Sequence, residues 1–201
     1  MTIVLRTDSD NYAHQVWAQE QANSCAIASL WMARNQALQM TVNEGEWALA
    51  WRVYGQVVQG IPLPLVPAPP APMSLNPASF PSDPKTVQKT FQIMFASDGT
   101  FMDQVAATLV KDGLHVTCIT EFRPGTSVVP GKLSDTTPAI VLLGWYNGAQ
   151  RNGGHFIVAS RTVRSGQVVY LDPWQGQLRE LGAGPGYPGG GRFEQVVYIS
   201  A

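Results

Sequence analysis

The feature that most constrains the fold is a change of hydrophobic periodicity near Gly113. Before it, apolar residues recur every three or four positions, which is the spacing of amphipathic or buried helices. After it, short apolar runs are separated by clusters of glycine, proline, asparagine and serine, which is typical of strands. The predicted helices begin at Cys25 and cover Glu46–Val58, Pro84–Phe95 and Thr100–Lys111. The predicted strands after Gly113 are Leu114–Thr120, Ala139–Trp145, His155–Arg161, Gln167–Leu171 and Phe193–Ile199.

Helices first and antiparallel strands second predict an α+β fold. We expect one domain over residues 1–201, since a chain of this length with 45% hydrophobic residues can bury a substantial core. In this prediction, a mainly helical N-terminal lobe (1–112) packs on a mainly antiparallel β lobe (113–201), with a cleft between them. A short edge strand at Thr2–Arg6 and a turn at Asp8–Asn11 come before the first helix.

A proline-rich segment interrupts the N-terminal half. Nine of the fifteen prolines lie between Pro62 and Pro84, and proline excludes both helix interiors and central strands. Residues 60–84 are therefore predicted to be extended surface chain, either a linker or a long loop that frames the cleft.

Charge and composition narrow the classes of partner. The formal net charge is -1, only 13% of residues are charged, and no basic cluster occurs. Nucleic acid and membrane surfaces are therefore poor candidates. No apolar run resembles a signal sequence or a transmembrane segment. We expect a protein that is cytoplasmic in the producing cell or exported without a signal peptide, and the oligomeric state stays open.

Cys25 is the first candidate for chemistry. Ser24 is a favourable N-cap residue, which places Cys25 in the first turn of a helix, where free N–H groups and the helix dipole stabilise a thiolate. A lone cysteine is more often a core residue, so a catalytic role requires a base. Cys25 and Cys118 have neither the spacing of metal ligands nor that of a disulfide framework, and we expect no metal or cofactor. His14 and His115 have the context of ordinary surface or core residues.

His155 has a context that indicates a base. It follows Gly153 and Gly154, which leave room for a ligand backbone, and it begins an apolar strand. Asp172 comes seventeen residues later, at the end of the next predicted strand. If these strands are antiparallel neighbours, the carboxylate lies beside the imidazole and can orient it toward a nucleophile.

Taken in order, these residues resemble the papain-like cysteine peptidases. A glutamine, Gln19, lies six residues before Cys25, a Gly-His pair at His155 begins a late strand, and Asp172 follows on the next strand with Trp174 two residues beyond it. The resemblance implies that Gln19 and the backbone N–H of Cys25 form the oxyanion hole, and that Trp174 shields the histidine–aspartate hydrogen bond. An aspartate in the third position is more similar to bacterial double-glycine leader peptidases and secreted effector proteases.

The resemblance predicts a cysteine peptidase that hydrolyses a peptide or isopeptide bond, with a protein or peptide as substrate and a bacterial secreted effector or toxin as one role. Gly153, Gly154 and Trp174 are then expected in the substrate site. The six-residue spacing favours Gln19 over Gln21 as the oxyanion donor. Two alternatives stay open: acyl transfer or deamidation by the same triad, and an inactive papain-like binding module.

Overall fold

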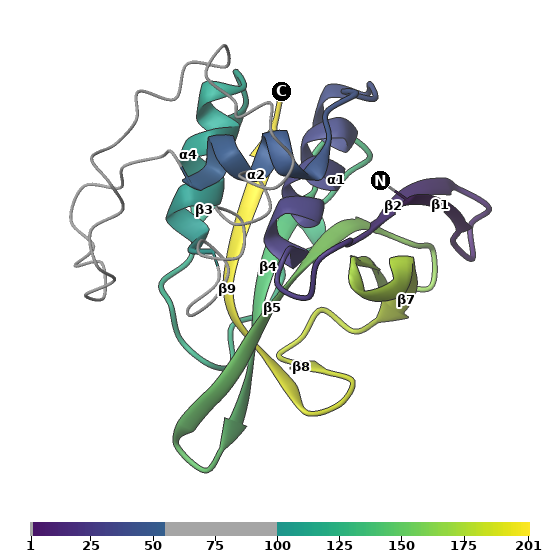
Figure 1. Ribbon diagram of the computed structural model, residues 1–201. Helices are drawn as coiled ribbons and strands as arrows, with labels where there is room; N and C mark the ends of the chain where they lie inside the picture. The colour runs from purple at the N-terminus through teal and green to yellow at the C-terminus, as the bar shows by residue number, and fades with distance from the viewer. Residues whose placement is uncertain (1, 55–99) are drawn as a thin grey trace, which may run out of the picture.

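A computed structural model describes residues 2–54 and 100–201, apart from the side chains of residues 54, 118 and 119 (Figure 1). The proline-rich segment at 60–84 and the helix predicted at Pro84–Phe95 lie outside the described residues. Within them, the chain forms a seven-stranded antiparallel sheet, a separate two-stranded sheet and three α-helices.

The two-stranded sheet is a hairpin at the N-terminal end. Strand β1 (Thr2–Thr7) pairs antiparallel with β2 (Ala13–Ala18). The predicted strand and turn are confirmed, whereas β2 was not predicted. In the turn, the Oδ1 atom of Asp8 accepts hydrogen bonds from the backbone N–H groups of Asp10 and Tyr12.

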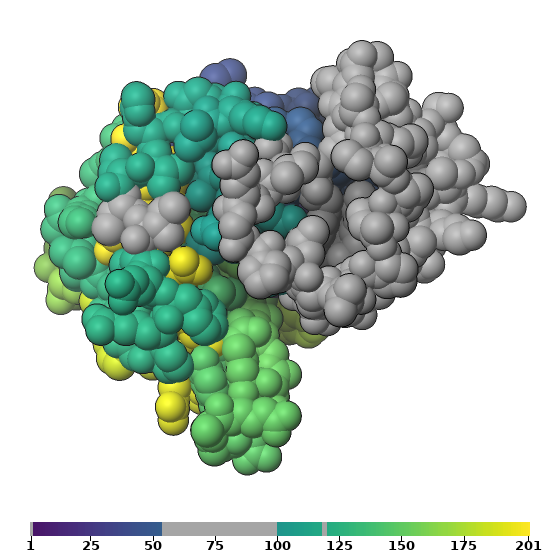
Figure 2. Space-filling model, turned by 90° about the vertical axis from the view of Figure 1, so that its left-hand side faces the viewer, coloured from purple at the N-terminus to yellow at the C-terminus, as the bar shows by residue number. Residues whose placement is uncertain are grey.

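The main sheet contains all five strands predicted after Gly113. In spatial order it consists of β3 (His115–Ile119), β9 (Gly191–Ser200), β4 (Ala139–Asn147), β5 (Gln150–Thr162), β6 (Val168–Asp172) and β7 (Gln177–Leu181), with β8 (Gly186–Tyr187) paired to β9. Two 3-10 turns, η2 (Pro130–Lys132) and η3 (Trp174–Gly176), lie in connections. The outer end of the β4–β5 hairpin projects from the body of the molecule (Figures 1 and 2).

The helices are α1 (Cys25–Leu38), α2 (Glu46–Tyr54) and α4 (Met102–Lys111). Helix α1 is buried on nearly all sides, because it packs on β5 and is also in contact with β2, α2 and α4. Its apolar residues pack against one face of the sheet and form a hydrophobic core with it. This core includes Ile27, Leu30 and Trp31 of α1 and Ile140 and Val158 of the sheet. The other face buries a second cluster that includes Val141, Ile157, Tyr170, Tyr187 and Phe193.

The predicted two-lobe α+β architecture is wrong. The described chain is mostly β, and its helices do not form a lobe that packs on a β lobe. Part of the region 1–112 is itself a β-hairpin, and α1 lies directly on the large sheet (Figure 1). The physical reason is that an α1 with apolar residues on all sides needs cover from several elements. The sheet supplies most of that cover.

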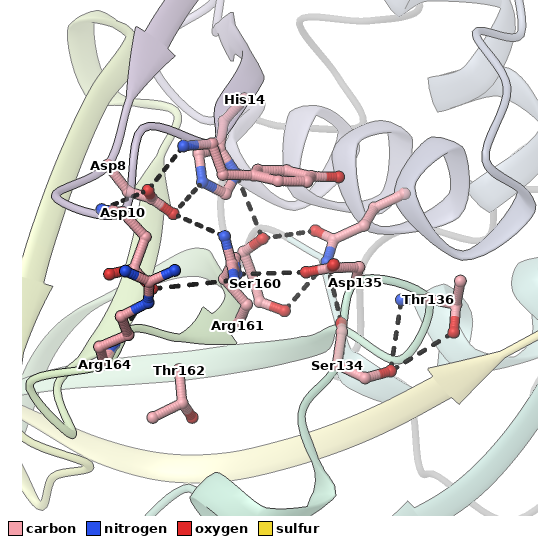
Figure 3. Close-up of polar contacts among 12 residues, drawn as sticks. Asp8, Asp10, His14, Ser134, Asp135, Thr136, Ser160, Arg161, Thr162 and Arg164 are labelled. Carbon is pink, nitrogen blue, oxygen red and sulfur yellow. Dashed lines mark hydrogen bonds and ion pairs between the residues drawn. The ribbon is translucent and has the colours of Figure 1, made fainter.

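A polar network joins the N-terminal hairpin to the sheet (Figure 3). The Oδ2 atom of Asp8 lies 3.0 Å from Nε2 of His14 and 3.3 Å from Nη1 of Arg161, which belongs to β5. Arg161 also lies 3.2 Å from Asp135. Asp8 and His14 are buried, at 4% exposure each. The buried carboxylate of Asp8 is thus paired with Arg161 and hydrogen-bonded to His14, so no buried charge in this network is isolated. The network connects the β1–β2 hairpin to β5.

Candidate active site

Cys25 is the first residue of α1, as predicted, and its side chain faces a cleft while only 9% of the residue is exposed. Ser24 occupies the N-cap position, but its side chain does not cap the helix. Instead, its hydroxyl donates to the carbonyl of Gln21 and accepts from the Gln21 N–H. This closes a tight loop before Cys25. Among the described residues, the backbone N–H of Cys25 has no acceptor.

His155 and Asp172 are brought together by the antiparallel pairing of β5 and β6. Nε2 of His155 lies 2.7 Å from Oδ1 of Asp172, and both side chains are largely buried, at 13% and 7% exposure. With Nε2 bonded to the carboxylate, Nδ1 is the ring nitrogen left for Cys25. The geometry is that of a histidine oriented by a carboxylate, as in nucleophile–histidine–acid triads.

The charge state of His155 depends on both neighbours. Burial alone would lower the pKa of His155, but the hydrogen bond to Asp172, the proximity of Cys25 and the charge of the Asp172 carboxylate raise this pKa to about 9. Burial would likewise raise the pKa of Asp172, yet its hydrogen bond to His155 and the charge of that imidazolium lower the pKa below its usual value. At neutral pH the structure therefore favours an imidazolium next to a carboxylate.

Asp172 accepts three hydrogen bonds in total. Besides His155, the backbone N–H of Trp174 donates to Oδ1 at 2.8 Å and the hydroxyl of Tyr187 donates to Oδ2 at 2.7 Å. Tyr187 was not identified from the sequence, because it lies in the glycine-rich segment 182–191, outside the predicted strands. Its one available signal was a lone aromatic residue inside that segment. Trp145 was also missed, and its ring centroid lies 6.2 Å from that of His155.

The cleft has a volume of about 970 Å³ and contains the predicted substrate residues Gly153, Gly154 and Trp174 in its lining, together with Cys25, His155 and Asp172. The residues that form its wall come from distant parts of the chain: the start of α1, the start of α4, the β4–β5 hairpin, β7 and the loop after β8. An opening of this size is compatible with an extended peptide or a similar ligand.

The glycine residues next to His155 differ in what surrounds them. A Cβ atom on Gly153 would meet nothing within 4 Å, so there is open space at this position. A Cβ atom on Gly154 would collide with the guanidinium of Arg151. That guanidinium pairs with Glu194, which is fully buried. Gly154 therefore makes room for the Arg151 guanidinium beside a buried carboxylate, and the space predicted there for a ligand backbone is occupied.

Gln19 lies apart from the cleft lining. Its Nε2 atom donates to the backbone carbonyls of Gln21 at 2.8 Å and Ala22 at 2.9 Å, which uses both amide hydrogens. Its Oε1 atom is buried and has no partner among the described residues. These contacts stabilise the loop before Cys25. In this arrangement Gln19 does not present a free donor to the cleft.

The Asp8–His14 pair continues to the hydroxyl of Ser160, which lies 3.3 Å from Nδ1 of His14 (Figure 3). This order of groups imitates a serine triad. Ser160 is fully buried, however, and its hydroxyl also donates to Oε1 of Gln36. A nucleophile must reach its substrate, so this second arrangement is structural.

Comparison with known proteins assigns no family to the chain. No family model matches it, and neither does any curated protein. Within residues 2–54 and 100–201, no group of three or more histidine, cysteine, aspartate or glutamate side chains has the arrangement of a metal site. None of the helices in this part of the chain is long and apolar enough to cross a membrane.

Proposed function

We propose that this protein is a cysteine hydrolase that cleaves a peptide or isopeptide bond, with the triad chemistry of papain-like cysteine peptidases. The observation that carries the proposal is that Cys25, His155 and Asp172 line one cleft, with His155 hydrogen-bonded to Asp172 and its pKa raised in part by Cys25. Three residues that are far apart in sequence meet in the order nucleophile, base and orienting acid.

The proposed reaction begins with attack of the Cys25 thiolate on the substrate carbonyl. The imidazolium of His155 then gives its proton to the leaving amine, and water hydrolyses the thioester with His155 as the base. Asp172 holds the ring so that Nδ1 faces the sulfur. The backbone N–H of Cys25 is the donor at the helix end toward which the oxyanion develops.

The proposed location is the cytoplasm of the producing cell or, after export, the outside of that cell. A secreted effector or toxin is one role of this kind. The substrate is a protein or peptide, and the proposal requires neither a metal nor a cofactor.

Profiling of new protein N-termini tests the proposal. A cell lysate is incubated with wild type, with Cys25→Ala, or with Cys118→Ala as the matched cysteine control. We expect new N-termini, or lysine side-chain amines newly freed from isopeptide bonds, with wild type and Cys118→Ala and none with Cys25→Ala. If Cys25-dependent incorporation of an added primary amine occurs without new N-termini, the enzyme is an acyltransferase. If neither signal depends on Cys25, the binding-module alternative replaces the proposal.

A further inference from the structure

Arg179 differs from the other partly buried arginine residues in the described chain. The buried Arg34 and the partly buried Arg52 and Arg161 each have a carboxylate oxygen within 3.3 Å. Arg179 is half-buried on β7, and no carboxylate of the described residues lies within 4.0 Å of its guanidinium. A guanidinium that is partly removed from water is ordinarily paired, because its desolvation is costly.

The contacts that Arg179 makes are with neutral groups. One nitrogen, Nη2, donates to Oε1 of Gln177, which lies on the same face of β7 two residues earlier. The guanidinium carbon lies 5.9 Å from the ring centroid of Tyr187. The Nε atom is buried and has no acceptor in the described part of the chain. An acceptor for this N–H is therefore missing.

Arg179 lines the same cleft as the triad. Its guanidinium lies near the ring of Tyr187, whose hydroxyl donates to the Asp172 carboxylate. The other arginine in the lining, Arg151, is already paired with Glu194. Across the cleft, the start of α4 contributes Asp103 to the wall, and α4 and β7 lie on opposite sides of α1 in the view of Figure 1. The β7 side of the cleft thus carries an uncompensated positive charge.

We propose that Arg179 binds a carboxylate of the substrate, so that the enzyme prefers peptides with an acidic group on the β7 side of the scissile bond. This inference rests on the proposed hydrolase function. A carboxylate matches the fork of guanidinium donors and would supply the charged partner that Arg179 lacks among the described residues. The carboxylate belongs either to an aspartate or glutamate side chain or to the free C-terminus of the peptide.

The test uses a peptide library prepared by digestion of a proteome, in one arm with free carboxyl groups and in the other with all carboxyl groups converted to amides. Cleavage sites are counted by mass spectrometry for wild type, Arg179→Gln, Arg179→Lys and Cys25→Ala. Arg164→Gln is the matched control, since Arg164 is exposed and lies outside the cleft lining.

We expect wild type and Arg164→Gln to enrich acidic residues at one fixed position, or to cut at a fixed distance from the free C-terminus. These two patterns identify the source of the carboxylate. Arg179→Gln should lose this preference, with a roughly ten- to hundredfold lower kcat/KM on acidic sites and little change on neutral ones. Arg179→Lys should retain part of it, since it keeps the charge.

Three outcomes would overturn the inference. Cleavage without an acidic preference, or an equal loss on acidic and neutral sites in Arg179→Gln, would make Arg179 a support for Tyr187 while leaving the hydrolase function intact. Equal cleavage of free and amidated peptides would do the same. Absence of any Cys25-dependent cleavage in the wild type would instead overturn the proposed function, and the inference with it.

Discussion

The hydroxyl of Tyr187 donates a 2.7 Å hydrogen bond to Oδ2 of Asp172, the carboxylate whose other oxygen is bonded to His155. Tyr187 is only 8% exposed and belongs to β8, so this bond ties the segment after β7 to the triad. A carboxylate held by donors on both oxygens cannot rotate away from the imidazole. Tyr187 is therefore part of the apparatus that orients His155.

Replacement of Tyr187 by phenylalanine should weaken this orientation. Removal of a hydrogen bond to a charged group costs roughly 1.5–3 kcal/mol, and we expect a lower free energy of unfolding together with a severalfold lower kcat on a peptide found by N-terminal profiling. Tyr170→Phe is the control, because its hydroxyl bonds the Gly182 carbonyl at 3.1 Å and not the triad. Unchanged kcat in Tyr187→Phe would assign Tyr187 a purely structural role.

Substitutions of Asp172 should separate hydrogen bonding from charge. In Asp172→Asn the amide oxygen still accepts from His155 and the Trp174 N–H, whereas Asp172→Ala leaves three donors without an acceptor. We expect kcat to fall much further in the alanine variant, and its urea midpoint to drop as well. Steady-state kinetics and urea unfolding on the same preparations measure both effects. Full activity in both variants would remove Asp172 from the mechanism.

Gln19→Ala should reveal which role Gln19 has. Its two hydrogen bonds to the loop before Cys25 predict a loss of stability of roughly 1–3 kcal/mol and a kcat loss below a hundredfold. An oxyanion donor would instead lower kcat by about 10²- to 10³-fold with unchanged stability. Gln21→Ala serves as the control, because Gln21 contacts the loop through its backbone, which the substitution leaves in place. We expect only a minor effect on stability and kcat. Thermal unfolding and single-turnover kinetics distinguish the two patterns.

Glu46 should make stability depend on pH. It is 1% exposed and accepts the Glu20 N–H through Oε2, while its Oε1 has no partner among the described residues. Burial raises the pKa of Glu46 from 4.5 to about 7, with the nearby charge of Glu20 adding to the rise, although the nearby Ser24 hydroxyl and the hydrogen bond from the Glu20 backbone act in the opposite direction.

Because the folded state holds this proton more tightly, stability should fall as pH rises from about 4.5 to 7 and then level off. Glu46→Gln should remove this loss. Relative to wild type, we expect its free energy of unfolding to be higher by up to about 3 kcal/mol at pH 8.5 and almost unchanged at pH 4.5. His155, with a pKa raised to about 9, adds a further decline from roughly pH 6.5 to 9 that the variant retains.

Urea unfolding at several pH values measures the Glu46 effect. Glu44→Gln is the control of opposite sign, because Glu44 pairs with Arg34 and Arg52 and its charge is stabilising. A pH profile of Glu46→Gln that parallels the wild type would show that Glu46 does not titrate in this range.

The local sequence was sufficient for element types and for the positions of the candidate triad. Five strands, the helix that begins at Cys25 and the pairing of His155 with Asp172 follow from short-range periodicity and from two strands close in sequence, and the described structure agrees with these predictions. Strand β7 was missed because its sequence, with two leucines among three polar residues, has no clear alternation of apolar and polar positions. All five of its residues are half-buried.

Only the tertiary structure decided how these elements are layered and which polar groups meet. Packing between distant segments decides which elements cover α1 and which side chain fills the space at Gly154. It also decides which acceptors the side chains of Tyr187 and Gln19 find. Periodicity reports which side of an element is apolar, but it contains no information on which partner covers that side. A hydrogen bond forms only when folding has brought donor and acceptor within about 3 Å, which is why the sequence alone identified the candidate Cys25, His155 and Asp172 but not the residues that hold them in place.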